Sequence, residues 1–171
     1  MQYVMFLRGI NVGGIRVPMG ELRVCLAQLG LTDIKTYLQT GNVTFSSSLP
    51  AAEIKSSVEK TLGEEFHYEA FILLFPAAII EKVITQYPFA ADDQTHRYAI
   101  FCGSQDIINE LAAYSSELID TVEAIAPGEN VLYWRAPKGS STDTFFSKIL
   151  SKSKYKATTT NRNLNTLEKM I

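Results

Sequence analysis

Two short segments at opposite ends of the chain carry the residue types that bind anions. The first is the turn Arg8–Gly14, in which an arginine, an asparagine and three glycines follow an apolar run. The second is Thr158–Asn163, where hydroxyls, amides and the guanidinium of Arg162 stand together. A guanidinium can form paired hydrogen bonds with phosphate or carboxylate oxygens, and free backbone N–H groups at a helix start favour negative charge. The two segments therefore predict an anion site.

Short-range patterns predict which elements hold the first segment. An apolar strand at residues 3–7 ends beside it, and a helix over residues 19–29 follows it. Residues 34–39 and 42–46 have the pattern of a hairpin joined at Thr40-Gly41. In a β-α-β-β-α-β unit, the end of the first strand, the start of the first helix and this hairpin meet at one end of the sheet. Together with the second segment, this gives the candidate ligand-binding residues Arg8, Gly9, Asn11, Gly13, Gly14, Gln39, Gly41, Asn42, Thr160, Arg162 and Asn163.

The similar chemistry of the two segments leads to a hypothesis about how they are arranged. We expect the C-terminal segment to fold back over the first half, which places Arg162 and Asn163 beside Arg8, Asn11 and Asn42. Two guanidinium groups that lie side by side repel each other unless an anion or carboxylates lie between them. A shared site of this kind predicts a bound anion or an acidic partner from the body of the protein.

Each of these features also has a purely structural explanation. Glycines in a tight loop supply positive φ angles, and Gly41-Asn42 is ordinary turn chemistry. Arg8 can pair with a carboxylate of the body, and either Thr160 or Asn161 can cap a final helix. The sequence leaves both explanations open.

Patterns of known catalytic and metal sites are missing from the sequence. It contains no GxSxG and no HExxH, and its GxxxGG is neither the dinucleotide fingerprint nor the phosphate loop. Two cysteines and two histidines do not make a disulfide framework or a zinc site. We therefore name no catalytic residue, no metal and no cofactor, and whether the chain is an enzyme stays open.

Composition places the chain among globular proteins of the cytoplasm. Of its 171 residues, 46% are hydrophobic and 20% are charged. No apolar run reaches the roughly 18 residues of a membrane helix, and the first residues lack the features of a signal peptide. The scarcity of cysteine fits a reducing compartment. We expect no membrane partner, and the oligomeric state stays open.

Charge and aromatic residues add two weaker signals near the C-terminus. Residues 148–171 contain six basic residues and one acidic residue, although the whole chain has a formal net charge of −2. Such a basic segment is either a mark of a phosphate-bearing partner or a solvated surface. Trp134 lies beside Arg135 and Lys138 and could stack on a base, but a tryptophan in a strand more often belongs to the core.

The order of predicted elements indicates an α+β protein built from two similar halves. Residues 1–75 predict β-α-β-β-α-β, a ferredoxin-like half, and residues 76–94 predict a linking helix and turn. Residues 95–152 repeat the pattern as β-α-β-β-α without the last strand, and residues 153–171 form a basic tail with a short helix from about Arg162. We expect the halves to pack together. The predicted core of the first half comprises Val4, Phe6, Leu22, Leu26, Val43, Phe45, Phe71 and Leu73.

Three motifs resemble a family of bacterial proteins catalogued as domain of unknown function 1697. They are LRGINVGG followed by VPMGELR, the hairpin YLQTGNVTF, and the terminal TNRNLNTLEKM. The resemblance implies a duplicated α+β fold of bacterial cytoplasmic type and implies no established activity. One departure is Leu164, where the family pattern often has an aromatic residue.

Three classes of function are compatible with these observations. The first is binding of a phosphate-bearing ligand, a nucleotide or RNA, through the RGINVGG loop and the TNRN segment. The second is an enzyme that acts on a small anionic substrate and uses Arg8 and Arg162 as clamps. The third is a structural or interaction protein whose polar motifs only hold loops. The low pI of about 5.7 is atypical of proteins that bind nucleic acid.

Overall fold

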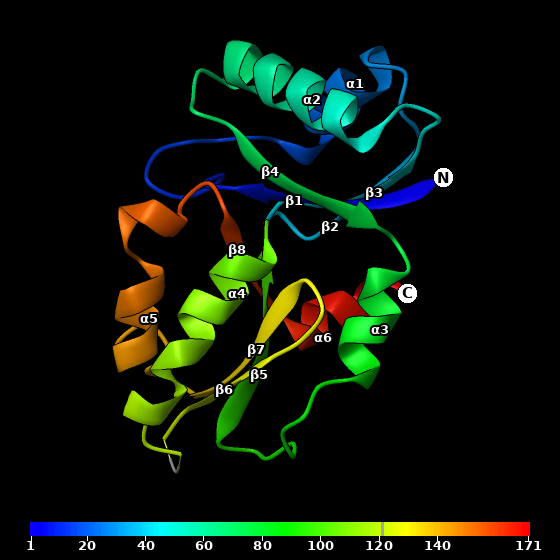
Figure 1. Ribbon diagram of the computed structural model, residues 1–171. Helices are drawn as coiled ribbons and strands as arrows, with labels where there is room; N and C mark the ends of the chain where they lie inside the picture. Colours follow the sequence, from blue (N-terminus) through cyan, green and yellow to red (C-terminus); the bar gives the residue numbers. More distant parts are fainter. Residues whose placement is uncertain (121) are drawn as a thin grey trace. The chain divides into compact units, whose positions relative to one another are not determined.

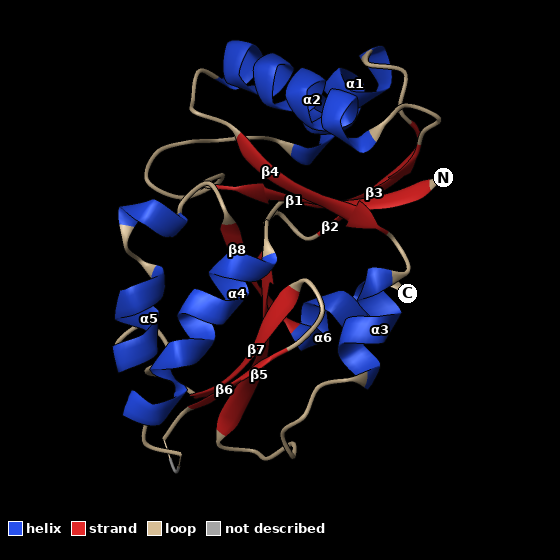
Figure 2. Ribbon diagram, in the orientation of Figure 1, coloured by secondary structure: helices blue, strands red, loops and turns tan. Residues whose placement is uncertain are grey.

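The computed structural model describes residues 1–120 and 122–171 (Figure 1). Residue 121, which falls within the strand predicted for residues 118–126, lies outside the described residues. The chain divides into two compact units, Met1–Ile79 with Met170, and Ile80–Lys169 with Ile171. Each unit contains one four-stranded sheet, drawn in red in Figure 2. The chain is therefore an α+β protein, as its sequence predicts.

The first unit has the strand order of a ferredoxin-like half. Its sheet runs β2-β3-β1-β4, and every neighbouring pair is antiparallel. Strands β1 and β2 are thus parallel with β3 antiparallel between them, which confirms the predicted topology. The elements are β1 (Gln2–Arg8), α1 (Met19–Gln28), β2 (Thr32–Tyr37), β3 (Asn42–Ser46), α2 (Ala51–Phe66) and β4 (Phe71–Pro76).

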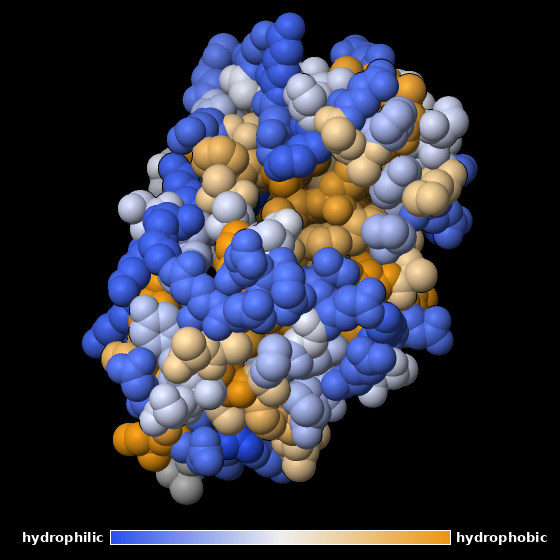
Figure 3. Space-filling view, in the orientation of Figure 1, coloured by the Kyte–Doolittle hydropathy of each residue, from blue (hydrophilic) through white to orange (hydrophobic). Residues whose placement is uncertain are grey.

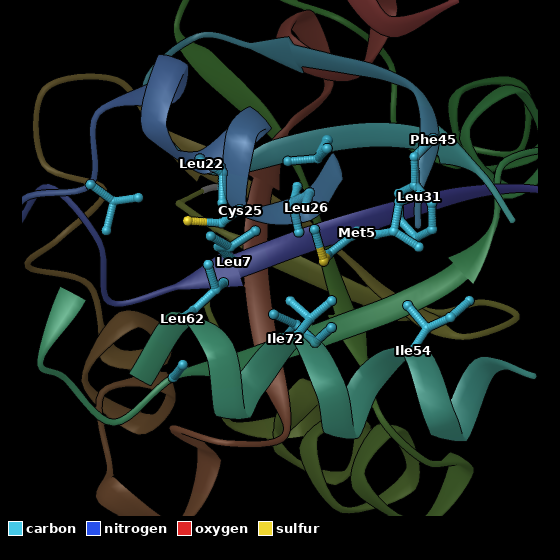
Figure 4. Close-up of a cluster of buried hydrophobic side chains, with 14 of the residues drawn as sticks. Met5, Leu7, Leu22, Cys25, Leu26, Leu31, Phe45, Ile54, Leu62 and Ile72 are labelled. Atoms are coloured by element: carbon cyan, nitrogen blue, oxygen red, sulfur yellow. The ribbon is translucent and has the colours of Figure 1, made fainter. Parts of the chain in front are cut away.

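Both helices of the first unit cover the same face of its sheet (Figure 1). Met5 and Leu7 of β1 face them and pack with Leu22 of α1 and Leu62 of α2 (Figure 4). The outward side of α2 is mostly hydrophilic (Figure 3), so this helix is amphipathic. Its buried stripe consists of Ile54, Val58 and Leu62.

The other face of β1 is buried as well. Val4 and Phe6 alternate with Tyr3, Met5 and Leu7 along the strand, and both are fully buried. Side chains alternate between the faces of a sheet, so these two do not belong to the cluster beneath the helices. The sequence pattern predicted a single core, whereas the structure divides the predicted residues between two faces. All the predicted core residues are buried except Phe71, which is half-buried.

The double burial of β1 makes Phe6 a sensitive position. We expect Phe6→Ala to lower the free energy of unfolding by about 3–5 kcal/mol, because truncation leaves a cavity that the sheet cannot close. Urea denaturation measures this loss. Val24→Ala on the exposed side of α1 is the control and should change stability by less than about 0.5 kcal/mol. A loss below about 1 kcal/mol at Phe6 would contradict close packing on this face.

An ion pair on α2 covers the outer edge of β4. The Lys55 ammonium donates to the Ile72 carbonyl oxygen at 2.7 Å, and the Ile72 N–H donates to the Glu59 carboxylate at 3.0 Å. Lys55 and Glu59 also pair with each other along the helix. An uncovered edge strand can pair with a strand of another chain, so charged groups placed here protect the apolar strand Phe71–Pro76 from association.

The second unit repeats the topology of the first. Its sheet runs β6-β7-β5-β8, and all neighbouring pairs are antiparallel. Because β5, β6, β7 and β8 correspond in order to β1, β2, β3 and β4, the chain consists of two copies of one fold pattern. Its main elements are α3 (Ile79–Thr85), β5 (Thr95–Cys102), α4 (Gln105–Ala112), β6 (Ala124–Pro127), β7 (Val131–Pro137), α5 (Phe145–Leu150), β8 (Thr159–Asn163) and α6 (Leu164–Leu167).

Strand β8 is the main difference from the sequence-based prediction. The pattern predicted a basic tail from residue 153 and a helix from about Arg162, but residues 159–163 pair with β5 and complete the second sheet. The helix begins later, at Leu164, and Asn163 rather than Thr160 or Asn161 caps it. The TTNRN stretch is polar and lacks the apolar residues that reveal a strand, so only its pairing partner identifies it as one.

A buried carboxylate organises the core of the second unit. The Trp134 indole N–H donates to Glu123 at 2.9 Å, and the Phe146 backbone N–H donates to the other carboxylate oxygen at 3.1 Å. Trp134 is buried and stacks on Tyr98 with ring centroids 5.0 Å apart. These contacts make Trp134 a core residue, and a role in stacking on a base has no support.

The hydrogen bonds of Glu123 predict a large effect on stability. Glu123→Ala leaves two buried donors without an acceptor, each at a cost of about 1–3 kcal/mol. We expect urea denaturation to show a loss of about 2–6 kcal/mol. Glu129→Ala is the matched control, because Glu129 is exposed and its ion pair with Lys82 lies at the surface. Equal losses for the two variants would contradict this role of Glu123.

Candidate anion-binding site

The connection between β1 and α1 distinguishes the first unit from the second. It spans Gly9–Pro18, which we call the glycine loop, whereas the equivalent connection between β5 and α4 is only Gly103 and Ser104. In that short connection the Ser104 side chain caps α4, which satisfies the helix start. Both connections join the same two elements of one fold pattern. The glycine loop is therefore longer than the fold requires.

Asn11 holds the glycine loop in place. Its side-chain N–H group donates to the Gln39 carbonyl oxygen at 2.6 Å and to the Val17 carbonyl oxygen at 3.4 Å. Its side-chain oxygen accepts from the Val17 N–H at 3.0 Å. The φ angle of Asn11 is 55°, in the left-handed region that asparagine tolerates better than most residues. The structure thus brings the loop and the β2–β3 hairpin together, as the ferredoxin-like pattern predicts.

Two glycines form the tip of the loop. Gly13 has a φ of 58° and Gly14 a φ of 85°, which agrees with the structural explanation that glycines in a tight loop supply positive φ angles. No atom lies within 4 Å of a Cβ built on either residue, so backbone conformation and not space selects glycine here. The turn is closed by the Ile15 N–H, which donates to the Val12 carbonyl oxygen at 3.1 Å.

A shallow depression of about 420 Å³ lies on the loop. Arg16 supplies its cation and is exposed. Among the described residues, the backbone N–H groups of Gly13 and Gly14 make no hydrogen bond. Successive N–H groups in a turn of this kind can form a concave site for an anion. The depression is lined by Asn11, Val12, Gly13, Gly14, Ile15, Arg16 and Gln39.

Arg8 lies at the end of β1, outside the lining of the depression. Its position alternates with Leu7 and lies across from Phe71, which assigns it to the sheet face away from the helices. The side chain is half-buried, and burial lowers the pKa of the Arg8 guanidinium. The group stays protonated at neutral pH, since arginine does not lose its proton in proteins. Gly9 follows with a φ of 72°.

Packing and hydrogen bonds explain the hairpin residues in structural terms. A Cβ on Gly41 would lie 2.6 Å from the Leu7 Cβ, so only glycine fits against β1. The Leu7 N–H donates to the Gly41 carbonyl oxygen at 2.8 Å. Asn42 is fully buried, and its amide donates to the Tyr37 carbonyl oxygen at 3.1 Å and to Thr40 Oγ1 at 2.7 Å. These two residues fix the hairpin that supports Gln39.

The three C-terminal candidates belong to the second unit. Thr160 is buried in β8 and accepts a hydrogen bond from the Arg162 guanidinium at 2.7 Å. Arg162 is half-buried and also donates to the Asn161 carbonyl oxygen at 2.8 Å. Asn163 accepts from the Asn165 N–H at 2.9 Å and so caps α6. Because Arg8 and Arg162 belong to different units, the hypothesis that they share one site stays a prediction.

Other chemistry finds little support in the described part of the chain. Residues 1–120 and 122–171 contain no group of histidine, cysteine and carboxylate side chains that could hold a metal ion. Both cysteines are buried, and burial raises the pKa of the Cys102 thiol to about 12, which disfavours the reactive thiolate. Within the described residues, every helix falls short of the length and apolar character that a membrane crossing requires.

Sequence reasoning left two features of the first unit out of the candidate set. Arg16 lines the depression, and its position within the glycine loop was the signal that could have included it. Asp33 and Lys35 line a separate cavity beside β2. No motif marks these two residues, because an irregularity in the pairing of β2 places them there.

The repeated strand order and the glycine loop define a class, a duplicated α+β protein whose first half carries an extended β1–α1 loop. The chain belongs to the family described as "Protein of unknown function (DUF1697)", whose model matches residues 1–133. This confirms the resemblance seen in the sequence, although the match does not reach the terminal TNRN motif.

A solved structure shares this fold over nearly the whole chain. It is the conserved bacterial protein SP0830 from Streptococcus pneumoniae, with 25% sequence identity and a TM-score of 0.80. The similarity covers 99% of this chain and 96% of that chain. A search of curated proteins gave no match.

The φ angles of the loop tip predict opposite effects for two kinds of glycine. We expect Gly13→Ala and Gly14→Ala each to lower the free energy of unfolding by more than about 1 kcal/mol, because alanine is strained at positive φ. Gly20→Ala is the matched control, since Gly20 lies in α1 with nothing closer than 4.0 Å to its Cβ position. That variant should gain up to about 1 kcal/mol in urea denaturation. If all three alanine variants were more stable than the unchanged protein, the positive φ angles of the loop tip would be contradicted.

Proposed function

We propose that this protein binds a phosphate-bearing ligand, a nucleotide or RNA, on the glycine loop. The observation that carries the proposal is the depression that Arg16, Gly13 and Gly14 line, because the N–H groups of the two glycines make no hydrogen bond among the described residues. Phosphate oxygens accept hydrogen bonds from both kinds of donor, and a charged donor strengthens them. A phosphate group is therefore the ligand that fits these donors best.

The anchoring of the loop supports this proposal. Asn11 ties the loop to Gln39 and Val17, and the Ile15 N–H donates to the Val12 carbonyl oxygen across the tip, so part of the loop backbone is held before a ligand arrives. Groups that are already ordered lose less conformational entropy on binding than mobile ones. Binding residues also concentrate on loops that a rigid scaffold positions, and this loop exceeds what its fold needs.

The C-terminal candidates extend the proposal. We propose that Arg162 and Asn163, together with Arg8, contribute to the same ligand, as the similar chemistry of the two segments indicates. The hydrogen bonds of Arg162 to Thr160 and Asn161 use one of its terminal nitrogens, Nη1. A guanidinium has five N–H donors, and side chains of this kind can bind more than one acceptor.

Two other functions make different predictions. A loop that serves only the fold binds no anion, and the contacts of Asn11 are the observation in its favour. An enzyme acting on a small anionic substrate needs a general base near the depression, and none of the seven lining residues is a histidine or a carboxylate. Binding is therefore the function that the depression supports best.

The arginine of the depression gives the direct test. Isothermal titration calorimetry with ATP and with a short single-stranded RNA should show binding by the unchanged protein. Arg16→Gln should weaken binding by about tenfold to a hundredfold, since a hydrogen bond to a charged group contributes about 1.5–3 kcal/mol. Arg23→Gln is the matched control, because Arg23 is an exposed arginine of α1 that contacts Thr36 instead. Absence of binding, or equal loss in both variants, would contradict the proposal.

Two further measurements resolve the finer parts of the proposal. Affinity for RNA should fall steeply with salt concentration, whereas a ligand with few phosphates should respond weakly. A double-mutant cycle of Arg8→Ala and Arg162→Ala tests the shared site, because residues that contact one ligand give non-additive losses. Thermal melts of Arg8→Ala with and without phosphate separate a ligand contact, which leaves stability nearly unchanged, from a structural ion pair. Additive losses would exclude the shared site.

A further inference from the structure

A second cavity lies on the first unit, away from the glycine loop. It has a volume of about 190 Å³, and β1, β2 and β3 supply most of its lining. This volume exceeds the roughly 10–15 Å³ that a cavity needs to hold one water molecule and is smaller than the roughly 300–1,000 Å³ of drug-sized sites. The cavity therefore suits a molecule of a few heavy atoms. Its polar lining side chains are Gln2, Asp33, Lys35, Tyr37, Thr44 and Ser46.

Two side chains of opposite charge line this cavity and do not form an ion pair with each other. Among the described residues, no ion pair and no hydrogen bond involves the Asp33 carboxylate or the Lys35 ammonium. Tyr37 and Thr44, which line the same cavity, have their hydroxyl groups 3.5 Å apart. Hydroxyls of this kind can donate to a carboxylate and accept from an ammonium. The lining thus offers partners to both signs of charge.

An irregularity in β2 places the two charged residues. Thr32 pairs with Ser46 and Lys35 pairs with Thr44, so three steps along β2 match two steps along β3. Asp33 lies within this bulge and has a φ of 52°, in the left-handed region that few residues with a side chain adopt. Bulges redirect side chains, and they are over-represented at sheet edges, where β2 lies, and next to active sites. The bulge therefore brings both charged residues to the lining of one cavity.

We propose that this cavity binds a small zwitterion of the α-amino acid class. The ammonium group of the ligand pairs with Asp33, and its carboxylate pairs with Lys35 and the neighbouring hydroxyls. A zwitterion can pair with both side chains at once, whereas a molecule with one charge can pair with only one of them. This site is separate from the glycine loop, and the inference does not depend on the proposed phosphate ligand.

The test uses the full chain and the twenty common L-amino acids as probes. Saturation-transfer NMR identifies the amino acids that bind, and titration gives their affinities. We expect at least one to bind and its N-acetyl and amide derivatives, which carry a single charge, to bind about tenfold more weakly or worse. No binding by any of the twenty, or equal binding of a derivative, would overturn the proposal.

Three variants assign the binding to this cavity. Asp33→Asn removes the charge and keeps a residue that tolerates positive φ, so the bulge is preserved. Asp33→Asn and Lys35→Gln should each reduce affinity by about tenfold or more. Lys60→Gln is the matched control, because Lys60 is an exposed lysine of α2 that does not line the cavity. Circular dichroism establishes that each variant is folded, and affinity that survives in both cavity variants overturns the assignment.

Discussion

The pairing of β1 on both sides is the constraint on which the first unit depends. Strand β1 lies between β3 and β4, so neither face and neither edge of it is open. One face carries Met5 and Leu7 under the helices, and the other carries Val4 and Phe6. A slip of one residue would exchange the two sets, which fixes the register. Because the Leu7 N–H donates to Gly41, the same register also positions the hairpin that Asn11 contacts.

A comparison of the two units distinguishes the elements that both contain from those that only the first unit has. Both units contain the same strand order, and both bury a helix-covered face of their sheet. The second unit joins β5 to α4 through Gly103 and Ser104 and remains a complete copy of the pattern. The glycine loop and the bulge of β2 are therefore additions to the pattern that the two units share. In proteins generally, binding residues are found on loops more often than on the elements that the loops connect.

In both units, buried polar side chains form hydrogen bonds with neighbouring groups. Asn42 donates its amide to the hairpin beside it, and Glu123 accepts from Trp134 and from the start of α5. Each is buried, and each satisfies backbone or side-chain groups that would otherwise be orphaned. Asp33, Lys35 and Arg16 differ from them, because these exposed side chains line cavities and make no hydrogen bond or ion pair among the described residues. They therefore have no structural role of the kind that Asn42 and Glu123 have.

The sequence by itself determined the α+β class, the topology of the first unit and the family. These follow from local patterns, namely apolar periodicity, turn chemistry and contiguous motifs. Only the tertiary structure decided that the polar TTNRN stretch is strand β8, because edge pairing with β5 leaves no apolar signal in the chain. It also decided that Asn42 is buried and that Asp33 and Lys35 line one cavity. Strand register, side-chain burial and the shifted pairing of β2 depend on residues that are distant in sequence. A local sequence pattern therefore cannot predict them.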